Sequence, residues 1–239
     1  MNNRDPYLYE GTDVLRNIDD IMDSSELRRH EAKLTNCGMH SVYRQEYQKF
    51  DAETLCNIHF TIFGHLYEWA GQYRTIQMAK PEDVLGGDTV RYAHPSEIKK
   101  QLSEIMKEVK KVKRTGKNDK DVVFRMVRIT SAIWHIHPFR EGNTRATIAF
   151  AVMWAKFLGF DVDHELFKQN AQYVRNALVW CTQGIYSNYE YLENIFYDAI
   201  LHESPVQEET EPTSNSKYQK VGDYEVKNYV ERPHEYKEE

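Results

Sequence analysis

HPFREGNTRATIAFAVMWAKFL, residues 137–158, joins a short polar run to a segment that is apolar almost all round. The apolar part, residues 144–158, has helical length and no polar face, so it predicts a helix at the centre of a bundle. A residue before proline is disfavoured in the helical conformation, so a preceding helix should end near His137. We therefore expect the polar run to be a tight connection between two core helices.

Other parts of the chain also indicate helices. Apolar residues recur at helical spacing in three further segments, which are residues 51–70, 95–112 and 121–136. Asp51 is a suitable N-cap for the first of them. Between residues 72 and 94 the pattern changes to two alternating runs around Pro81 and a Gly-Gly pair, which predicts a β-hairpin. The expected fold class is mainly α, a helical bundle with one hairpin.

Composition narrows the class of protein. The net charge of −6 argues against a general nucleic-acid binder, and the basic run Lys107–Lys120 is typical of a solvated helix end. The 3 cysteines lack metal-ligand spacing, so neither a disulfide framework nor a thiolate metal site is expected. No N-terminal signal segment and no run of roughly 18 apolar residues is present, which predicts no membrane association. A cytoplasmic location is expected, although a signal-independent secretion route would leave no trace.

The composition changes near Leu201. In residues 203–239 acidic residues outnumber basic ones and aliphatic residues are few, so this segment should contribute little to a core. It nevertheless contains four tyrosines, Tyr218, Tyr224, Tyr229 and Tyr236. We expect one domain over residues 1–202, followed by an acidic, tyrosine-containing tail that is partly flexible.

The polar run carries groups suited to phosphorus chemistry. His137 has a side chain that can accept a proton near neutral pH, and Glu141 offers the hard oxygen ligand that Mg²⁺ prefers. Gly142 would let the backbone approach a phosphate, and Asn143 is a good N-cap for the next helix, whose N-terminus favours anions. Arg145 is disfavoured there by the helix dipole, so a bound anion would compensate it. Together these groups describe transfer of a phosphorus group to a hydroxyl.

Ordinary structural roles remain open for the same residues. A His–Pro pair in a turn is usually structural, and Arg140 with Glu141 could be a surface ion pair worth under about 1 kcal/mol. His135 and His137 are spaced so that they do not face one metal ion. Phe139 most simply fills the core and fixes the loop. Residue types alone do not decide between these roles and phosphate chemistry.

The run HPFREGNTR resembles the signature of Fic-domain proteins, which is H, any residue, F, any residue, D or E, G, N, any residue, R. The match is unbroken from His137 to Arg145. Similarity to the family extends to residues 4–17, 63–76 and 189–196. The resemblance implies a Fic-type helical bundle within residues 1–202. A β-hairpin flap, at about 72–94, would lie over the motif loop 137–145.

The resemblance also implies an enzyme, a protein adenylyltransferase that moves AMP from ATP to a Tyr, Thr or Ser hydroxyl of a target protein. His137 would deprotonate that hydroxyl, and Glu141 would hold Mg²⁺ between the α- and β-phosphates. Asn143 would orient the α-phosphate and Arg145 would bind the β-phosphate. The residues implied to contact the nucleotide are Gly142, Asn143, Thr144 and Arg145. The target segment would align along the flap by strand-like contacts.

One position departs from the family pattern. The longer Fic signature has a second arginine three residues after the first, where this chain has Ile148. In the family that arginine contacts the outer phosphate and pairs with an autoinhibitory glutamate. The alternative is therefore a Fic-fold protein that binds a nucleotide or partner, with weak or altered transfer from another nucleotide or a phosphocholine donor. Gly142 favours nucleotidyl transfer.

Regulation and partners are expected from the same resemblance. The family's inhibitory motif reads S or T, three residues, E, then G or N; Glu193-Asn194 fits its end, but Tyr189 stands at its start. We expect Glu193 to face solvent on a last helix. The N-terminal segment is similar to that of members restrained by a small antitoxin protein. The expected partners are a target protein and such an inhibitor, in a bacterial cytoplasm; the sequence predicts no particular oligomeric state.

Overall fold

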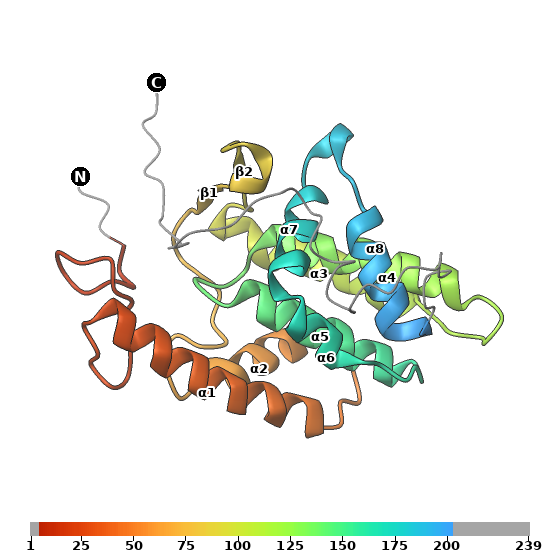
Figure 1. Cartoon of the computed structure of the whole chain (residues 1–239), viewed down its shortest axis with the longest axis horizontal. Helices are drawn as coiled ribbons and strands as arrows, with labels where there is room; N and C mark the ends of the chain where they lie inside the picture. Colours follow the sequence, from red (N-terminus) through yellow and green to blue (C-terminus); the bar gives the residue numbers. More distant parts are fainter. Residues whose placement is uncertain (1–4, 203–239) are drawn as a thin grey trace, which may run out of the picture.

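The fold is a helical bundle with one β-hairpin, as predicted. The computed structural model describes residues 5–202, and over these residues it contains eight α-helices and a two-stranded antiparallel sheet (Figure 1). The helices are α1 Ser24–Arg44, α2 Ala52–Phe63, α3 Pro95–Lys111, α4 Asp119–Ile136, α5 Asn143–Phe157, α6 His164–Gln169, α7 Ala171–Trp180 and α8 Glu190–Leu201. The strands are β1 Ala79–Pro81 and β2 Thr89–Arg91, and short 3-10 helices span Asp83–Leu85 and Gly184–Tyr186.

Helix α5 occupies the centre of the bundle. It packs against α1, α2 and α4, and its side chains are buried on nearly every face, including Phe150 and Trp154 (Figure 1). This burial explains why the segment has no polar stripe. The predicted helices at 95–112, 121–136 and 144–158 are confirmed within one or two residues as α3, α4 and α5.

The predicted helix over residues 51–70 is wrong in its length. Asp51 caps α2 as expected, since its carboxylate accepts a hydrogen bond of 2.9 Å from the Thr54 N–H. The helix ends at Phe63, however, and Gly64 is its C-cap. Leu66, beyond the end of the helix, is buried but lies in a turn. The helical spacing of apolar residues therefore continues past the point where the helix ends.

The hairpin forms inside the predicted range. Lys80 pairs with Val90 in antiparallel register, and Gly86 and Gly87 have φ values of 67° and 96°, which the turn requires and glycine readily adopts. The buried Glu82, just after β1, forms an ion pair of 2.7 Å with the partly buried Arg175 of α7. The hairpin is therefore attached to the helical body at its turn as well as at its base.

Arg74 ties the base of the hairpin to the end of α4. Its guanidinium is buried and donates hydrogen bonds to four carbonyl oxygens: those of His137 (2.7 Å), Ile76 (2.6 Å), Ala93 (2.5 Å) and Ile136 (3.3 Å). Burial lowers its pKa to about 10, so it remains protonated at neutral pH. One side chain thus fixes both ends of the hairpin segment against the motif loop.

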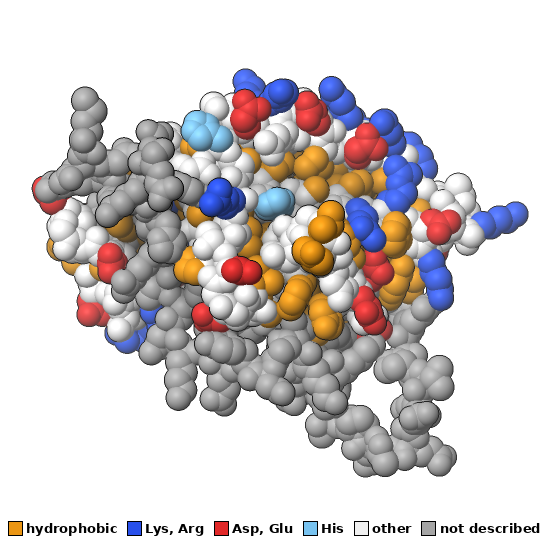
Figure 2. Space-filling view, turned by 90° about the horizontal axis from the view of Figure 1, so that it is seen from above, with side chains coloured by type: hydrophobic (Ala, Val, Ile, Leu, Met, Phe, Trp, Pro, Cys, Tyr) orange, Lys and Arg blue, Asp and Glu red, His pale blue; other side chains and the backbone are white. Residues whose placement is uncertain are grey.

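The charged surface agrees with the ordinary interpretation of the basic run. Figure 2 shows the face that carries the hairpin, with basic and acidic side chains interleaved along its upper edge. Within this run Lys111 lies 2.6 Å from Glu108, and Arg114 lies 2.8 Å from Asp119.

Over residues 5–202 no helix is both long and apolar enough to cross a membrane. The predicted tail, residues 203–239, lies outside the described residues.

Replacing Arg74 with methionine should destabilise the fold. The substitution keeps much of the side-chain volume but leaves four carbonyl oxygens without their donor, so we expect the free energy of unfolding to fall by roughly 3 kcal/mol. Urea denaturation measures this change. The control is Arg29→Met, on the exposed face of α1, which should change stability by less than about 0.5 kcal/mol. Equal stabilities for the two variants would show that the Arg74 hydrogen bonds are not structural.

Candidate active site

The loop between α4 and α5 is bounded by two residues with left-handed backbone conformation. His137 caps the end of α4 with φ 53° and ψ 61°, and Gly142 caps the start of α5 with φ 77°. A Cβ at residue 142 would lie 2.2 Å from the Phe63 ring, so only glycine fits there. Left-handed conformation is uncommon for a residue other than glycine, and such residues concentrate at functional sites.

Asn143 does not have the capping role that the sequence predicts. It is the first residue of α5, and Gly142 is the N-cap. The Asn143 amide instead forms two hydrogen bonds with the Phe139 backbone: its Oδ1 accepts from the N–H at 2.9 Å and its Nδ2 donates to the carbonyl at 2.8 Å. Asn143 closes the loop from inside the helix, because the left-handed glycine takes the capping position.

His137 is buried with one ring nitrogen already engaged. Its Nδ1 lies 3.3 Å from the Trp134 carbonyl oxygen, and a carbonyl only accepts, so Nδ1 carries the proton in this contact. The neutral ring then has Nε2 as its acceptor atom, and this atom lies 3.5 Å from the Lys80 ammonium. The ring stacks on Tyr92 at 3.8 Å between centroids. The tautomer assigned from this network is the one that a general base needs at Nε2.

Glu141 lies beside the start of α5. Its Oε1 accepts a hydrogen bond of 2.8 Å from the Gly142 N–H and lies 3.4 Å from Arg145 Nη2. A single carboxylate suits Mg²⁺ when phosphate oxygens supply the other ligands. Over residues 5–202 no group of three His, Cys, Asp or Glu side chains could hold a metal ion by itself. The donors that the protein offers here therefore fit a magnesium ion that arrives with a phosphate ligand.

His59 supports the loop from beneath and was not singled out by the sequence. Its Nε2 lies 2.9 Å from the Glu141 carbonyl oxygen, and its Nδ1 accepts from the Gly71 N–H at 2.9 Å. The ring stacks on Phe139 at 3.9 Å, which confirms that Phe139 fills the core beneath the loop. Burial lowers the pKa of His59 to about 3, so it is neutral. Its only signal in the sequence is a histidine on an apolar helical stripe.

The start of α5 has the geometry of an anion site. The first intrahelical hydrogen bond is donated by Ala146 to the Gly142 carbonyl, so the N–H groups of Asn143, Thr144 and Arg145 have no acceptor within the helix. The Thr144 hydroxyl accepts a bond of 2.9 Å from the Trp134 indole. Helix N-termini of this kind bind phosphate groups. The predicted nucleotide contacts therefore lie together in one turn.

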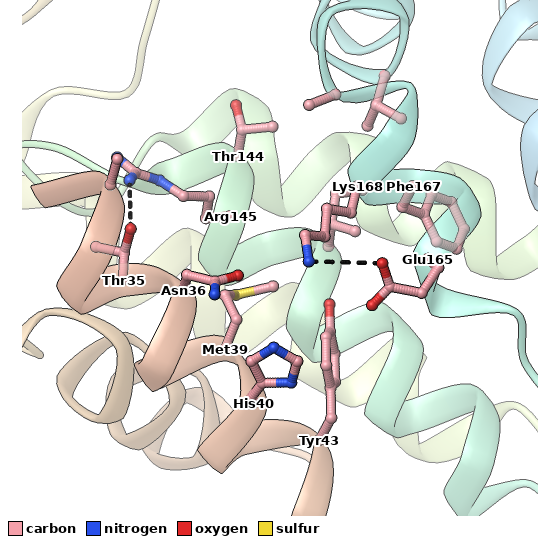
Figure 3. Close-up of a pocket in the computed structure, with 14 residues that line it drawn as sticks. Thr35, Asn36, Met39, His40, Tyr43, Thr144, Arg145, Glu165, Phe167 and Lys168 are labelled. Carbon is pink, nitrogen blue, oxygen red and sulfur yellow. Dashed lines mark hydrogen bonds and ion pairs between the residues drawn. The ribbon is translucent and has the colours of Figure 1, made fainter. Parts of the chain in front are cut away.

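Arg145 contacts two carboxylates of the protein itself. Its Nη2 lies 2.5 Å from a carboxylate oxygen of Glu31 in α1 and 3.4 Å from one of Glu141. Its Nη1 donates a hydrogen bond of 3.2 Å to the Thr35 hydroxyl (Figure 3). Glu31 is in turn held by the Tyr67 hydroxyl at 2.6 Å. The sequence predicts a bound anion near Arg145. It gives no sign that a carboxylate of α1, that of Glu31, lies there.

Ile148 lies in the wall of an apolar cavity of about 250 Å³ beside Arg145. Met39 and Tyr43 of α1 form one side, Phe167 and Val174 of α6 and α7 form the other, and the Lys168–Glu165 ion pair of 3.5 Å lies at the rim (Figure 3). Ile148 is 5 % exposed. The substitution that the sequence singled out therefore gives the site an apolar wall one turn beyond Arg145.

Glu193 does not face solvent as predicted. Its side chain is 20 % exposed and lies 3.7 Å from the guanidinium of Arg128, a residue of α4. Arg128 in turn stacks on the ring of Tyr189 at 3.5 Å. Glu193 therefore helps to join α8 to α4.

Comparison with known proteins identifies the domain. Residues 49–155 match the Fic/DOC family. The chain contains a Fic domain. The matched residues run from the start of α2 through the hairpin and the motif loop to the end of α5, and they include the whole motif loop.

Several relatives of this Fic domain are adenylyltransferases by name. The probable protein adenylyltransferase y4lH of Sinorhizobium fredii is 28% identical over 66% of this chain and 79% of its own. Protein adenylyltransferase VbhT of Bartonella schoenbuchensis is also 28% identical, but the match spans only 32% of VbhT. The crystal structure of BepC from Bartonella tribocorum with bound AMPPNP has a TM-score of 0.68 and 26% identity, over 81% of this chain and 95% of that one.

The neutral state of His59 predicts a pH dependence of stability. The unfolded histidine binds a proton below its ordinary pKa of 6.5, whereas the folded one does not until about 3, so stability falls as the pH falls through this range. Between pH 7 and 5 the wild type should lose about 2 kcal/mol more free energy of unfolding than His59→Gln. Urea denaturation at the two pH values tests this, and the exposed control His40→Gln should lose as much as the wild type. Parallel losses in wild type and His59→Gln would refute it.

Proposed function

We propose that this Fic domain is a protein adenylyltransferase that moves AMP from ATP to a Tyr, Thr or Ser hydroxyl of a target protein. The observation that carries the proposal is the pairing of an acceptor nitrogen, His137 Nε2, with a helix N-terminus built from the same loop. The names of its relatives and the AMPPNP bound to BepC support it.

The proposed reaction is a displacement at the α-phosphorus of ATP. The target hydroxyl oxygen forms a bond to this phosphorus as its proton passes to His137 Nε2. The bond from phosphorus to the oxygen bridging the β-phosphate breaks, and pyrophosphate leaves with that electron pair. The Trp134 carbonyl accepts from Nδ1–H and thereby stabilises the imidazolium that forms. A positioned base of this kind contributes roughly 10² to 10⁴ in rate.

The remaining motif residues would hold the nucleotide. Backbone N–H groups of Asn143 and Thr144 would contact the phosphates at the start of α5, where the helix dipole also favours them. Arg145 would bind the β-phosphate after exchanging a carboxylate for it. Glu141 would hold Mg²⁺ together with the phosphates, and the ion would neutralise phosphate charge.

The hairpin offers a surface for the target. Within residues 5–202 the sheet has only two strands, so each strand has one edge without a strand partner. An extended peptide can add to such an edge through main-chain hydrogen bonds. We infer that the target segment docks there, beside His137. A small antitoxin partner stays a prediction from the N-terminal resemblance.

The decisive assay uses ATP labelled separately at the α- and γ-phosphates, with Mg²⁺ and a cell lysate as a source of targets. We expect protein labelling from the α-label only, and loss of at least about 10²-fold of the rate in His137→Ala, because the general base is removed. Labelling from the γ-phosphate would indicate a kinase. Undiminished α-labelling by His137→Ala would eliminate the proposed mechanism.

A second candidate is a Fic-fold protein that binds a nucleotide or a partner without turnover, and the apolar wall at Ile148 favours it. Ile148→Arg separates the two candidates. The leading proposal expects transfer by the wild type and a change of less than about tenfold on substitution, measured as the initial rate of α-label transfer. A silent wild type that Ile148→Arg activates would favour the second candidate.

A further inference from the structure

We propose that Lys80 of the hairpin is a further catalytic residue, whose ammonium contacts the phosphoryl group while it is transferred. This inference rests on the proposed adenylyl transfer and adds to it a group from outside the motif. Lys80 is the middle residue of β1, far in sequence from His137, and no pattern in the sequence distinguishes it from the other lysines.

The position of Lys80 is unusual for a lysine. It is 1 % exposed and pairs with Val90, which is also buried, so the inward face of the hairpin carries one aliphatic and one charged side chain. Burying an ammonium costs free energy that an aliphatic residue would not. Its Nζ lies 3.5 Å from His137 Nε2 and 5.9 Å from the centre of the Tyr92 ring. The charge is therefore held beside the atom assigned as the base.

Distances place the reacting group within reach of this charge. A hydroxyl must come within about 2.6–3.2 Å of Nε2 to lose its proton, and its oxygen lies about 3–3.5 Å from the reacting centre. Lys80 Nζ already lies 3.5 Å from the same nitrogen. When the hydroxyl takes that place, the flexible lysine side chain needs only a small movement to meet a non-bridging oxygen of the α-phosphate.

A positive charge from Lys80 would be useful because the cation at the other end of the loop, Arg145, is already paired with carboxylates. Arg145 is shared by the carboxylates of Glu31 and Glu141, and the next turn of α5 presents Ile148 instead of a cation. Negative charge on the transferring group must be balanced while the bonds exchange. Lys80 approaches from the hairpin side, and its contribution is a hydrogen bond to the transferring group.

The test compares Lys80→Met, Lys80→Arg and the control Lys99→Met, the last on the exposed surface of α3. Three quantities are measured: the initial rate of α-label transfer at saturating ATP, the Kd of ATP by calorimetry in a His137→Ala background, and the midpoint of urea unfolding. For Lys80→Met we expect a rate loss of roughly 10²- to 10³-fold, as for loss of one charge-stabilising donor. The Kd should change by less than about threefold, Lys80→Arg should recover part of the rate, and Lys99→Met should match the wild type.

Several results would overturn the inference. A rate for Lys80→Met within about threefold of the wild type would show that the ammonium is not used. A Kd that weakens as much as the rate falls would show uniform binding of the nucleotide, and not a contact made in the transition state. Equal losses in Lys80→Met and Lys80→Arg with a lowered unfolding midpoint would assign Lys80 a structural role. If the wild type transfers no α-label, the proposed adenylyl transfer itself fails.

Discussion

The backbone of the six residues between α4 and α5, residues 137–142, determines the geometry of the whole site. His137 and Gly142 are both left-handed, so the chain reverses between them and returns to the central helix. Such a loop is stable only if its polar backbone groups are satisfied. Arg74 donates a hydrogen bond to the carbonyl of His137, and His59 contacts that of Glu141. His59 belongs to α2 and Arg74 to the base of the hairpin segment, so the loop is held by elements outside the motif.

The hydrogen bonds from Arg74 and His59 hold the His137 ring and the start of α5 at the two ends of one loop. The acceptor nitrogen of His137 lies beside Lys80 of the hairpin, and the N–H groups at the start of α5 follow directly after the same loop. Catalysis of phosphoryl transfer depends mainly on positioning and on charge, so little further machinery is needed. The Glu31–Arg145 ion pair adds an exchange step, since a phosphate must replace a carboxylate at the arginine. Nucleotide binding and release would therefore involve α1 as well as the motif.

The sequence predicts well what is local and poorly what depends on distant contacts. Helical spacing located α4 and α5, and the contiguous motif singled out His137 and Arg145 as candidates, because each signal lies within a few residues. Glu31 and Lys80 reach the site from other elements, so no spacing in the sequence connects them to it. Asn143 was predicted as the N-cap of α5, but Gly142 takes that position, and the Asn143 amide bonds instead to the backbone of Phe139 in the loop.

We propose that this preformed loop holds the α-phosphate of ATP next to His137 Nε2. A crystal structure with Mg²⁺ and an ATP analogue whose α–β bridging oxygen is replaced by methylene tests it directly. We expect the α-phosphate to lie against the first-turn N–H groups of α5, with the loop backbone displaced by less than about 1 Å. A nucleotide bound elsewhere, for example in the cavity beside Ile148, or a loop rebuilt around the ligand, would contradict it.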